Sequence, residues 1–79
     1  MPLMLVLSKI RNVQDSVLKE RLLLDWGTFM VEKNDFDWAE PPLLDAIELS
    51  KYNQTTETEA EAYFQLGELY YLLEIPLQA

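Results

Sequence analysis

Two features of the sequence predict an all-α fold. Apolar residues recur at spacings of three and four, and no segment alternates apolar and polar residues as a strand does. The chain has 79 residues, about half the ~150 of a typical domain, so it forms one domain at most. We expect an antiparallel helix–turn–helix stack of about four helices, with a small helical bundle as the alternative.

The first two helices are expected over about 3–12 and 14–33. Asn12, followed three residues later by Asp15, is a candidate cap for the second helix, and Ser16 competes with it. Because no proline or glycine separates the two segments, one continuous helix is the alternative. The apolar positions that line the first helix are Leu3, Val6, Leu7, Ile10 and Val13.

The polar pair Asn34-Asp35 predicts a turn after the second helix. A third helix is expected to begin near Glu40 or Pro41 and to end at about Tyr52. The two consecutive prolines suit its first turn, where backbone N–H groups lack helical partners in any case.

A polar loop at 53–56 separates the third helix from the fourth. Thr56 and Glu59 have the spacing of a capping box, in which each side chain satisfies the other residue's free N–H. The fourth helix is expected to run to about Glu74. Pro76 then either stops that helix or opens another.

The two glycines suggest an internal repeat, because a shift of 40 along the chain places Gly27 on Gly67. A glycine inside a helix costs roughly 1 kcal/mol relative to alanine, so we expect close backbone approach at both positions. Repeats with periods of this size indicate stacked units that bury their apolar faces against one another. The apolar pairs that the same shift superposes are Leu23 and Tyr63, Leu24 and Phe64, Trp26 and Leu66, Phe29 and Leu69, Met30 and Tyr70, Val31 and Tyr71, and Ala39 and Ala79.

The segment from Ala62 to Tyr70, AYFQLGELY, resembles the tetratricopeptide repeat, a helix–turn–helix unit of about 34 residues. That family places a large apolar residue, Leu-Gly, Tyr and then Ala at fixed offsets, and Ala79 stands where the next small residue belongs. The earlier copy has residues of the same type, large apolar or small, at the family's positions: Leu23, Trp26, Gly27, Met30, Ala39, Leu43 and Ala46.

The resemblance covers about one and a half degenerate units within a single domain, 1–79. It implies an N-terminal helical extension (1–19), a first unit (20–53) and a partial second unit (54–79), with Gly27, Gly67, Ala39 and Ala79 as structural positions. The chain departs from the family in its period of 40. The double proline also falls inside what would be the second helix of the first unit.

In the family, the first helix of each unit lines a concave groove for peptides. By register, the resemblance implies partner-binding residues in both units: Leu24, Thr28 and Val31 from the first, and Phe64, Glu68 and Tyr71 from the second. Family grooves that clamp peptide carboxylates use Asn, Lys and Arg at such positions, and these are mostly absent here. A basic or apolar peptide is therefore the expected ligand.

The charge balance narrows the class of partner. Lysine and arginine number 6 against 14 acids, for a formal net charge of −8. Duplex nucleic acid and anionic membranes both attract basic patches, so we expect neither as a partner. A protein or a peptide remains.

Side chains for catalysis are scarce. The absence of cysteine and histidine excludes thiolate and imidazole chemistry and the common zinc sites. Asp35, Asp37 and Glu40 cluster beside Phe36 and Trp38, but a solvated turn and a helix N-terminus explain that cluster better than an acid–base pair does. We predict no enzyme, no metal and no cofactor. A hard cation held by carboxylates is the remaining alternative.

These observations favour a non-enzymatic, cytoplasmic protein–protein interaction module or scaffold that binds a peptide or partner helix. The alternatives are an obligate self-assembling helical unit and a fragment of a longer helical-repeat protein. The apolar start at 1–7 is shorter than the ~20 residues that cross a bilayer. Because so small a core barely offsets its ordering entropy, we expect a homodimer, in contact through 57–74 or the apolar N-terminal helix.

Overall fold

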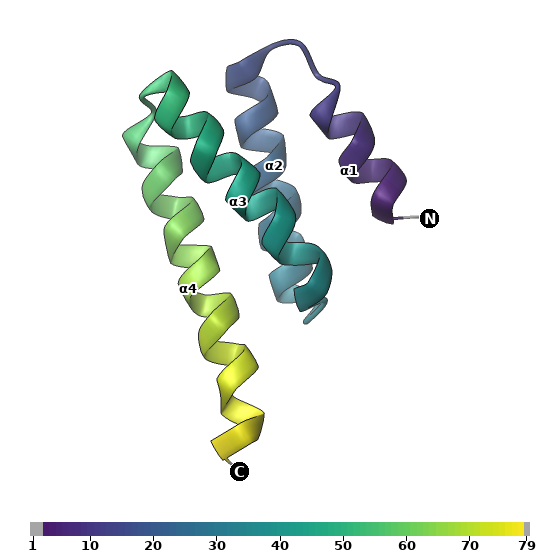
Figure 1. Cartoon of the computed structure of the whole chain (residues 1–79), viewed down its shortest axis with the longest axis vertical. Coiled ribbons are helices and arrows are strands. Elements are labelled where there is room, and N and C mark those ends of the chain that lie inside the picture. The colour runs from purple at the N-terminus through teal and green to yellow at the C-terminus, as the bar shows by residue number, and fades with distance from the viewer. Residues whose placement is uncertain (1–2, 79) are drawn as a thin grey trace.

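Four helices joined by short connections make up the part of the chain that the computed structural model describes, residues 3–78. No strand occurs within these residues, which confirms the all-α prediction (Figure 1). The helices are α1 (Leu3–Arg11), α2 (Ser16–Glu32), α3 (Phe36–Asn53) and α4 (Thr56–Gln78).

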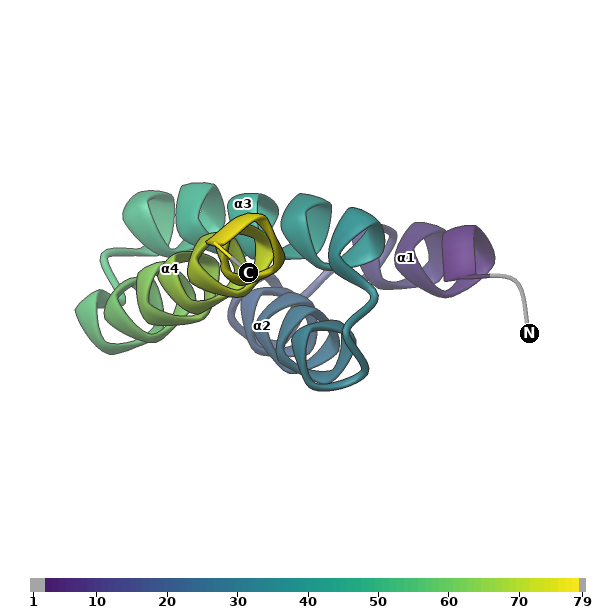
Figure 2. The ribbon, with the colours of Figure 1, turned by 90° about the horizontal axis from the view of Figure 1, so that it is seen from below.

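Successive helices run in opposite directions and form two layers. Seen from below, α1 and α3 lie in one layer and α2 and α4 in the other (Figure 2). The central helix α3 packs against both α2 and α4, whereas α1 packs mainly on α2. The helices α1 and α4 therefore lie at opposite ends of the stack (Figure 1).

The apolar core lies between α2, α3 and α4. Alanines at 39, 46 and 62 are fully buried, and small side chains at such positions let neighbouring backbones approach closely. At the edge of the stack, Arg11 of α1 donates from Nε to Asp45 Oδ2 of α3 at 2.7 Å. The buried apolar side chains of the three main helices are Leu23, Leu24, Met30, Val31, Ala39, Leu43, Ala46, Ile47, Ala62, Leu66 and Leu69.

Both expected caps of α2 are wrong: Asn12 lies three residues before the cap position, and Ser16 is already the first helical residue. Asp15 is the N-cap, and its Oδ1 accepts hydrogen bonds from the backbone N–H groups of Val17 and Leu18, both at 3.1 Å. The helix accordingly begins at Ser16, two residues later than expected. The alternative of one continuous N-terminal helix is wrong, because the chain leaves the helix after Arg11.

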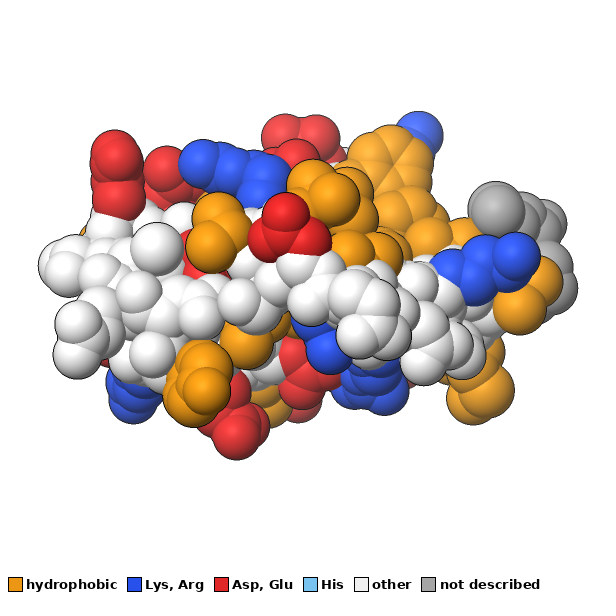
Figure 3. Space-filling view, turned by 90° about the horizontal axis from the view of Figure 1, so that it is seen from above, with side chains coloured by type: hydrophobic (Ala, Val, Ile, Leu, Met, Phe, Trp, Pro, Cys, Tyr) orange, Lys and Arg blue, Asp and Glu red, His pale blue; other side chains and the backbone are white. Residues whose placement is uncertain are grey.

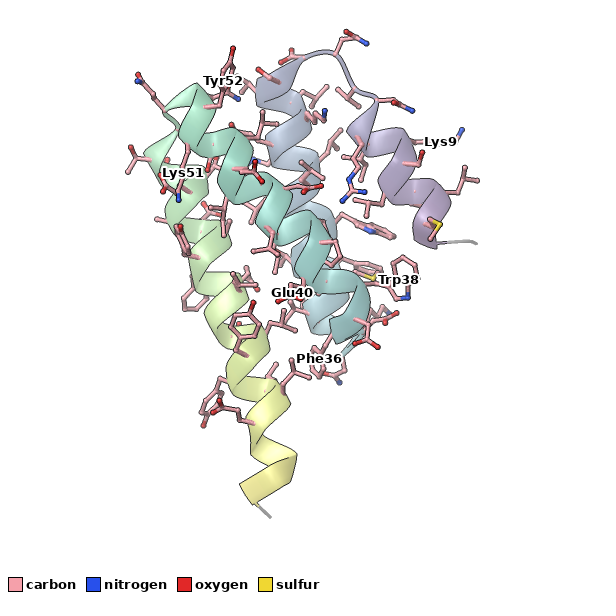
Figure 4. The ribbon with its side chains drawn as sticks, viewed as in Figure 1. Lys9, Phe36, Trp38, Glu40, Lys51 and Tyr52 are labelled. Atoms are coloured by element: carbon pink, nitrogen blue, oxygen red, sulfur yellow. The ribbon has the colours of Figure 1, made fainter. Side chains whose placement is uncertain are left out.

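The expected start of α3 is also wrong, since the helix begins at Phe36 and carries both prolines in its second turn. Proline lacks an N–H, so Pro41 and Pro42 leave two carbonyls of the preceding turn without helical partners. Packing offsets that loss: Ala39 is fully buried, and Phe36 and Trp38 pack against the core (Figure 4). The expected turn at Asn34 is present, with φ at 61°.

The helix α4 begins at Thr56 and continues to Gln78, so Pro76 does not stop it near Glu74. The expected capping box is absent. Thr56 is already helical, so the residue at the N-cap position is Thr55. The Thr55 carbonyl accepts a hydrogen bond from the Glu59 N–H at 3.1 Å. The shift of 40 that superposes the two glycines also superposes the starts of α2 and α4.

Candidate functional site

Among the side chains of α4 that the structure describes, those up to Glu74, the most exposed apolar surface is a stripe on the side away from the core. Its members recur at spacings of four and three, which places them on one helix face. Phe64 is 67% exposed and Tyr71 is 65% exposed, whereas Ala62 and Leu69, on the opposite face, are buried. We call this surface the outer stripe; it consists of Ala60, Phe64, Gly67 and Tyr71, all of them exposed.

Two tyrosines form the rim of the outer stripe nearest α3, and both are tied to that helix. The Tyr70 hydroxyl donates a hydrogen bond to Glu40, and Lys51 Nζ lies 5.6 Å from the centre of the Tyr63 ring. Both partners lie along α3 in Figure 4. The hydrogen bond to Glu40 raises the pKa of Tyr70, and hydrogen bonding to Tyr63 raises the pKa of Lys51.

The other rim of the outer stripe is acidic. Glu57, Glu61 and Glu68 are exposed there at helical spacing. The only cation that approaches this rim within the described residues is Arg21 of α2, whose Nη1 lies 3.8 Å from Glu61 Oε2. Since α4 contains no lysine or arginine, the stripe lies between an aromatic edge and a negatively charged edge.

The two glycines lie in opposite surroundings. A Cβ at Gly27 would lie 2.6 Å from both Cγ and Cδ2 of Leu43 and 3.4 Å from the Ala39 carbonyl oxygen. A Cβ at Gly67 would meet nothing within 4 Å. The expected close approach is therefore present at Gly27 and wrong at Gly67, because no described helix packs on that side of α4.

The structure separates the six residues that were expected to bind a partner. Leu24 and Val31 are buried, at 2% and 4% exposure, and belong to the core, while Thr28 is half-buried. Phe64, Glu68 and Tyr71 are exposed together on α4. Of the expected structural positions, Ala39 is fully buried beside Gly27, and Ala79 lies outside the described residues.

Sequence reasoning missed a buried polar cluster around Glu20, which is 1% exposed. Its Oε1 accepts from Asn53 Nδ2 at 2.9 Å, and its Oε2 accepts from Thr55 Oγ1 at 2.6 Å. Asn53 Oδ1 in turn accepts from Ser16 Oγ at 3.2 Å. The cluster therefore ties α2 to the connection between α3 and α4.

Electrostatics at Glu20 favour the carboxylate form. Burial by itself raises the pKa of this carboxyl, but hydrogen bonds from Thr55, Asn53 and Thr58 outweigh it, and the pKa lies below its ordinary value. Because each carboxylate oxygen of Glu20 accepts a hydrogen bond, the cluster stabilises the fold. The signal that could have found it is the spacing of Glu20, four residues before Leu24 on the buried face.

An apolar groove lies between α1 and α2. It is lined by Ile10, Leu22, Asp25, Trp26 and Phe29, and the two aromatic rings stack with centres 5.6 Å apart. Seen from above, apolar atoms gather on the side of α1 and α2, while polar and backbone atoms cover the connection between α3 and α4 (Figure 3).

Asp35, Asp37 and Glu40, near the start of α3, do not come together as a group of three potential metal ligands. Glu40 accepts from Tyr70, and nowhere within the described residues do three potential metal-ligating side chains converge. Within the same residues, no helix is both long and apolar enough to cross a membrane.

The chain has no match among protein-family models, curated protein sequences or solved structures. The resemblance to tetratricopeptide repeats therefore stays a prediction.

Proposed function

We propose that this chain is a non-enzymatic protein–protein interaction module that binds a helix of a partner along the outer stripe of α4. The observation that carries the proposal is the exposure of Phe64 and Tyr71 on the face opposite the core. Contiguous apolar surface on a small protein is typical of an interaction site. Aromatic residues are also enriched at such interfaces.

The energetics of the stripe support this role. Burying one large apolar side chain contributes about 1.5–3 kcal/mol, so covering Phe64 and Tyr71 together supplies a useful fraction of a specific interaction. The rim tyrosines are already held by α3. A partner that covers the stripe therefore loses little entropy in ordering that edge.

The experiment places a photo-crosslinking amino acid at position 64, and separately at position 44, and identifies a crosslinked protein. The partner is then purified and titrated against wild type, Phe64→Ser and Leu44→Ser. Leu44 is a matched control, since it is 44% exposed on α3 and lies outside the stripe. We expect Phe64→Ser to weaken binding at least about tenfold and Leu44→Ser to leave it unchanged. Equal effects of the two substitutions contradict the proposal.

Self-assembly is the second candidate. The helix α1 exposes Met4 at 68% and Leu5 at 48%, at the end of the stack opposite the outer stripe. A second copy could therefore cover both apolar ends, as a homodimer or through head-to-tail contacts. Sedimentation at micromolar concentration tests this candidate, and a 9.3 kDa monomer contradicts it.

A further inference from the structure

The contact between Gly27 of α2 and Leu43 of α3 is an internal example of how a helix covers this kind of face. Leu43 is fully buried over the glycine, and the Ala39 carbonyl lies beside it. Leucine fits because glycine leaves a notch that no side chain fills. The notch lets α3 approach α2 closely along a face that also contains Leu24 and Val31.

The outer stripe repeats that face in α4. The shift of 40 places Leu24 on Phe64, Gly27 on Gly67 and Val31 on Tyr71. Gly67 costs α4 roughly 1 kcal/mol relative to alanine, yet it meets nothing within 4 Å. No contact within the described residues requires a glycine at position 67. A helix that packs on α4 as closely as α3 packs on Gly27 requires one.

Charge distinguishes between possible occupants of the stripe. The acidic rim holds Glu57, Glu61 and Glu68, and the whole chain has a net charge of −8. A second copy adds the same negative charge, whereas a helix with basic residues beside its apolar face pairs with the rim.

On these grounds, and resting on the proposed function, we infer that the occupant of the outer stripe is a basic amphipathic helix of another protein. Its leucine lies in the Gly67 notch as Leu43 lies over Gly27. Lysine or arginine on the same helix pairs with the acidic rim. The aromatic rings of Phe64 and Tyr71 flank the leucine.

The test uses two synthetic peptides derived from α3, residues 36–53, both with Pro41→Ala and Pro42→Ala to favour an isolated helix. The basic peptide also has Asp37→Lys, Asp45→Lys and Glu48→Lys, while the acidic peptide keeps these residues. All three positions lie outside the buried face of α3. Each peptide is titrated against the full chain and against Gly67→Leu, Phe64→Ser and Leu44→Ser, with circular dichroism to check folding.

We expect the basic peptide to bind at least about tenfold more tightly than the acidic one. Its affinity should fall as NaCl is raised from about 50 to 500 mM. Gly67→Leu fills the notch and Phe64→Ser removes apolar contact, so each should weaken binding at least about tenfold, whereas Leu44→Ser should not. The Gly67→Leu result also shows whether the peptide binds on the outer stripe or instead displaces α3 from Gly27.

Equal binding of the two peptides, no binding by either, or full binding by Gly67→Leu overturns the inference. If the crosslinked partner still requires Phe64 in that case, the proposed function stands and only the occupant is wrong. If wild type sediments as a dimer, Phe64→Ser sediments as a monomer and neither peptide binds, the occupant is a second copy and the inference fails.

Discussion

The helices α2 and α4 carry a similar pattern at the same register, yet α2 buries that pattern and α4 exposes it. Around Gly27, the neighbouring Leu24 and Val31 are at most 4% exposed, whereas Phe64 and Tyr71 around Gly67 are at least 65% exposed. The difference arises from the next element in the chain. The helix α3 folds back over this face of α2, while no helix within residues 3–78 packs on the equivalent face of α4.

This comparison shows that a helix does not by itself determine which of its faces becomes core. The helix α4 packs through Ala62 and Leu69, and its glycine-containing face stays free. The register-equivalent residues of α2, Leu22 and Phe29, are only partly covered and line the groove beside α1. Each helix therefore has two faces able to pack, and its neighbours in the chain decide which one is buried.

The largest expected effect is loss of the leucine that covers Gly27. Leu43→Ala removes a fully buried side chain and leaves a cavity, so it should destabilise the fold by about 2–5 kcal/mol. Leu44→Ala is the matched control on the same helix, because Leu44 is partly exposed and its loss should stay within about 0.5 kcal/mol. Urea unfolding followed by circular dichroism measures both. Similar losses for the two variants contradict the packing described at Gly27.

The second effect concerns Gly27 itself. Gly27→Ala places a Cβ 2.6 Å from Leu43, and overpacking of about 1–3 kcal/mol should exceed the roughly 1 kcal/mol that alanine gains in helix propensity. In a Leu43→Ala background the added methyl has room, so the same substitution should become favourable. A double-mutant cycle of unfolding free energies measures this coupling. Additive effects of the two substitutions would show that a Cβ at position 27 does not clash with Leu43.

The third effect is a pH dependence that arises from Glu20. Its pKa lies below the ordinary value of 4.5 in the folded chain, so its stabilisation is fully present above 4.5 and is lost as the pH falls through the folded pKa. Glu20→Gln should therefore be less stable than wild type at pH 7, by about 1–3 kcal/mol, and the gap should narrow in acid. Urea unfolding of both proteins from pH 7 to pH 3, at constant ionic strength, measures the gap.

A control at the register-equivalent position sharpens that result. Ala60 is exposed, so Ala60→Gln should change stability by less than about 0.5 kcal/mol at every pH. If the gap between wild type and Glu20→Gln stays constant with pH, the hydrogen-bonded carboxylate is not its source.

The smallest effect is a gain. Gly67→Ala adds a methyl group in open space and should stabilise the free chain by up to about 1 kcal/mol through helix propensity. The sign is opposite to that expected at Gly27, which makes the pair a direct comparison of covered and uncovered faces. Thermal unfolding of the two alanine variants is sufficient. A lower melting temperature for Gly67→Ala would show that something already packs on the outer stripe.

The sequence by itself determined the all-α class and the approximate extent of each helix, because the spacing of apolar residues is a local property. It also placed a turn at Asn34. Its prediction of close approach at both glycines is confirmed at Gly27 and wrong at Gly67. Local rules failed at the start of α3. The double proline indicated a later start. Burial of Ala39 and packing of Phe36 and Trp38 nevertheless stabilise helical structure before the two prolines.

Only the tertiary structure decided which residues are accessible. Leu24 and Phe64 are equivalent by register, yet one lies under α3 and the other faces solvent, because accessibility depends on where neighbouring helices pack and not on local spacing. The same holds for Glu20, which becomes a buried carboxylate only because Asn53 and Thr55, from a distant part of the sequence, supply its hydrogen bonds. Periodicity identifies the faces of a helix, and contacts between distant segments determine which of those faces remains free to bind.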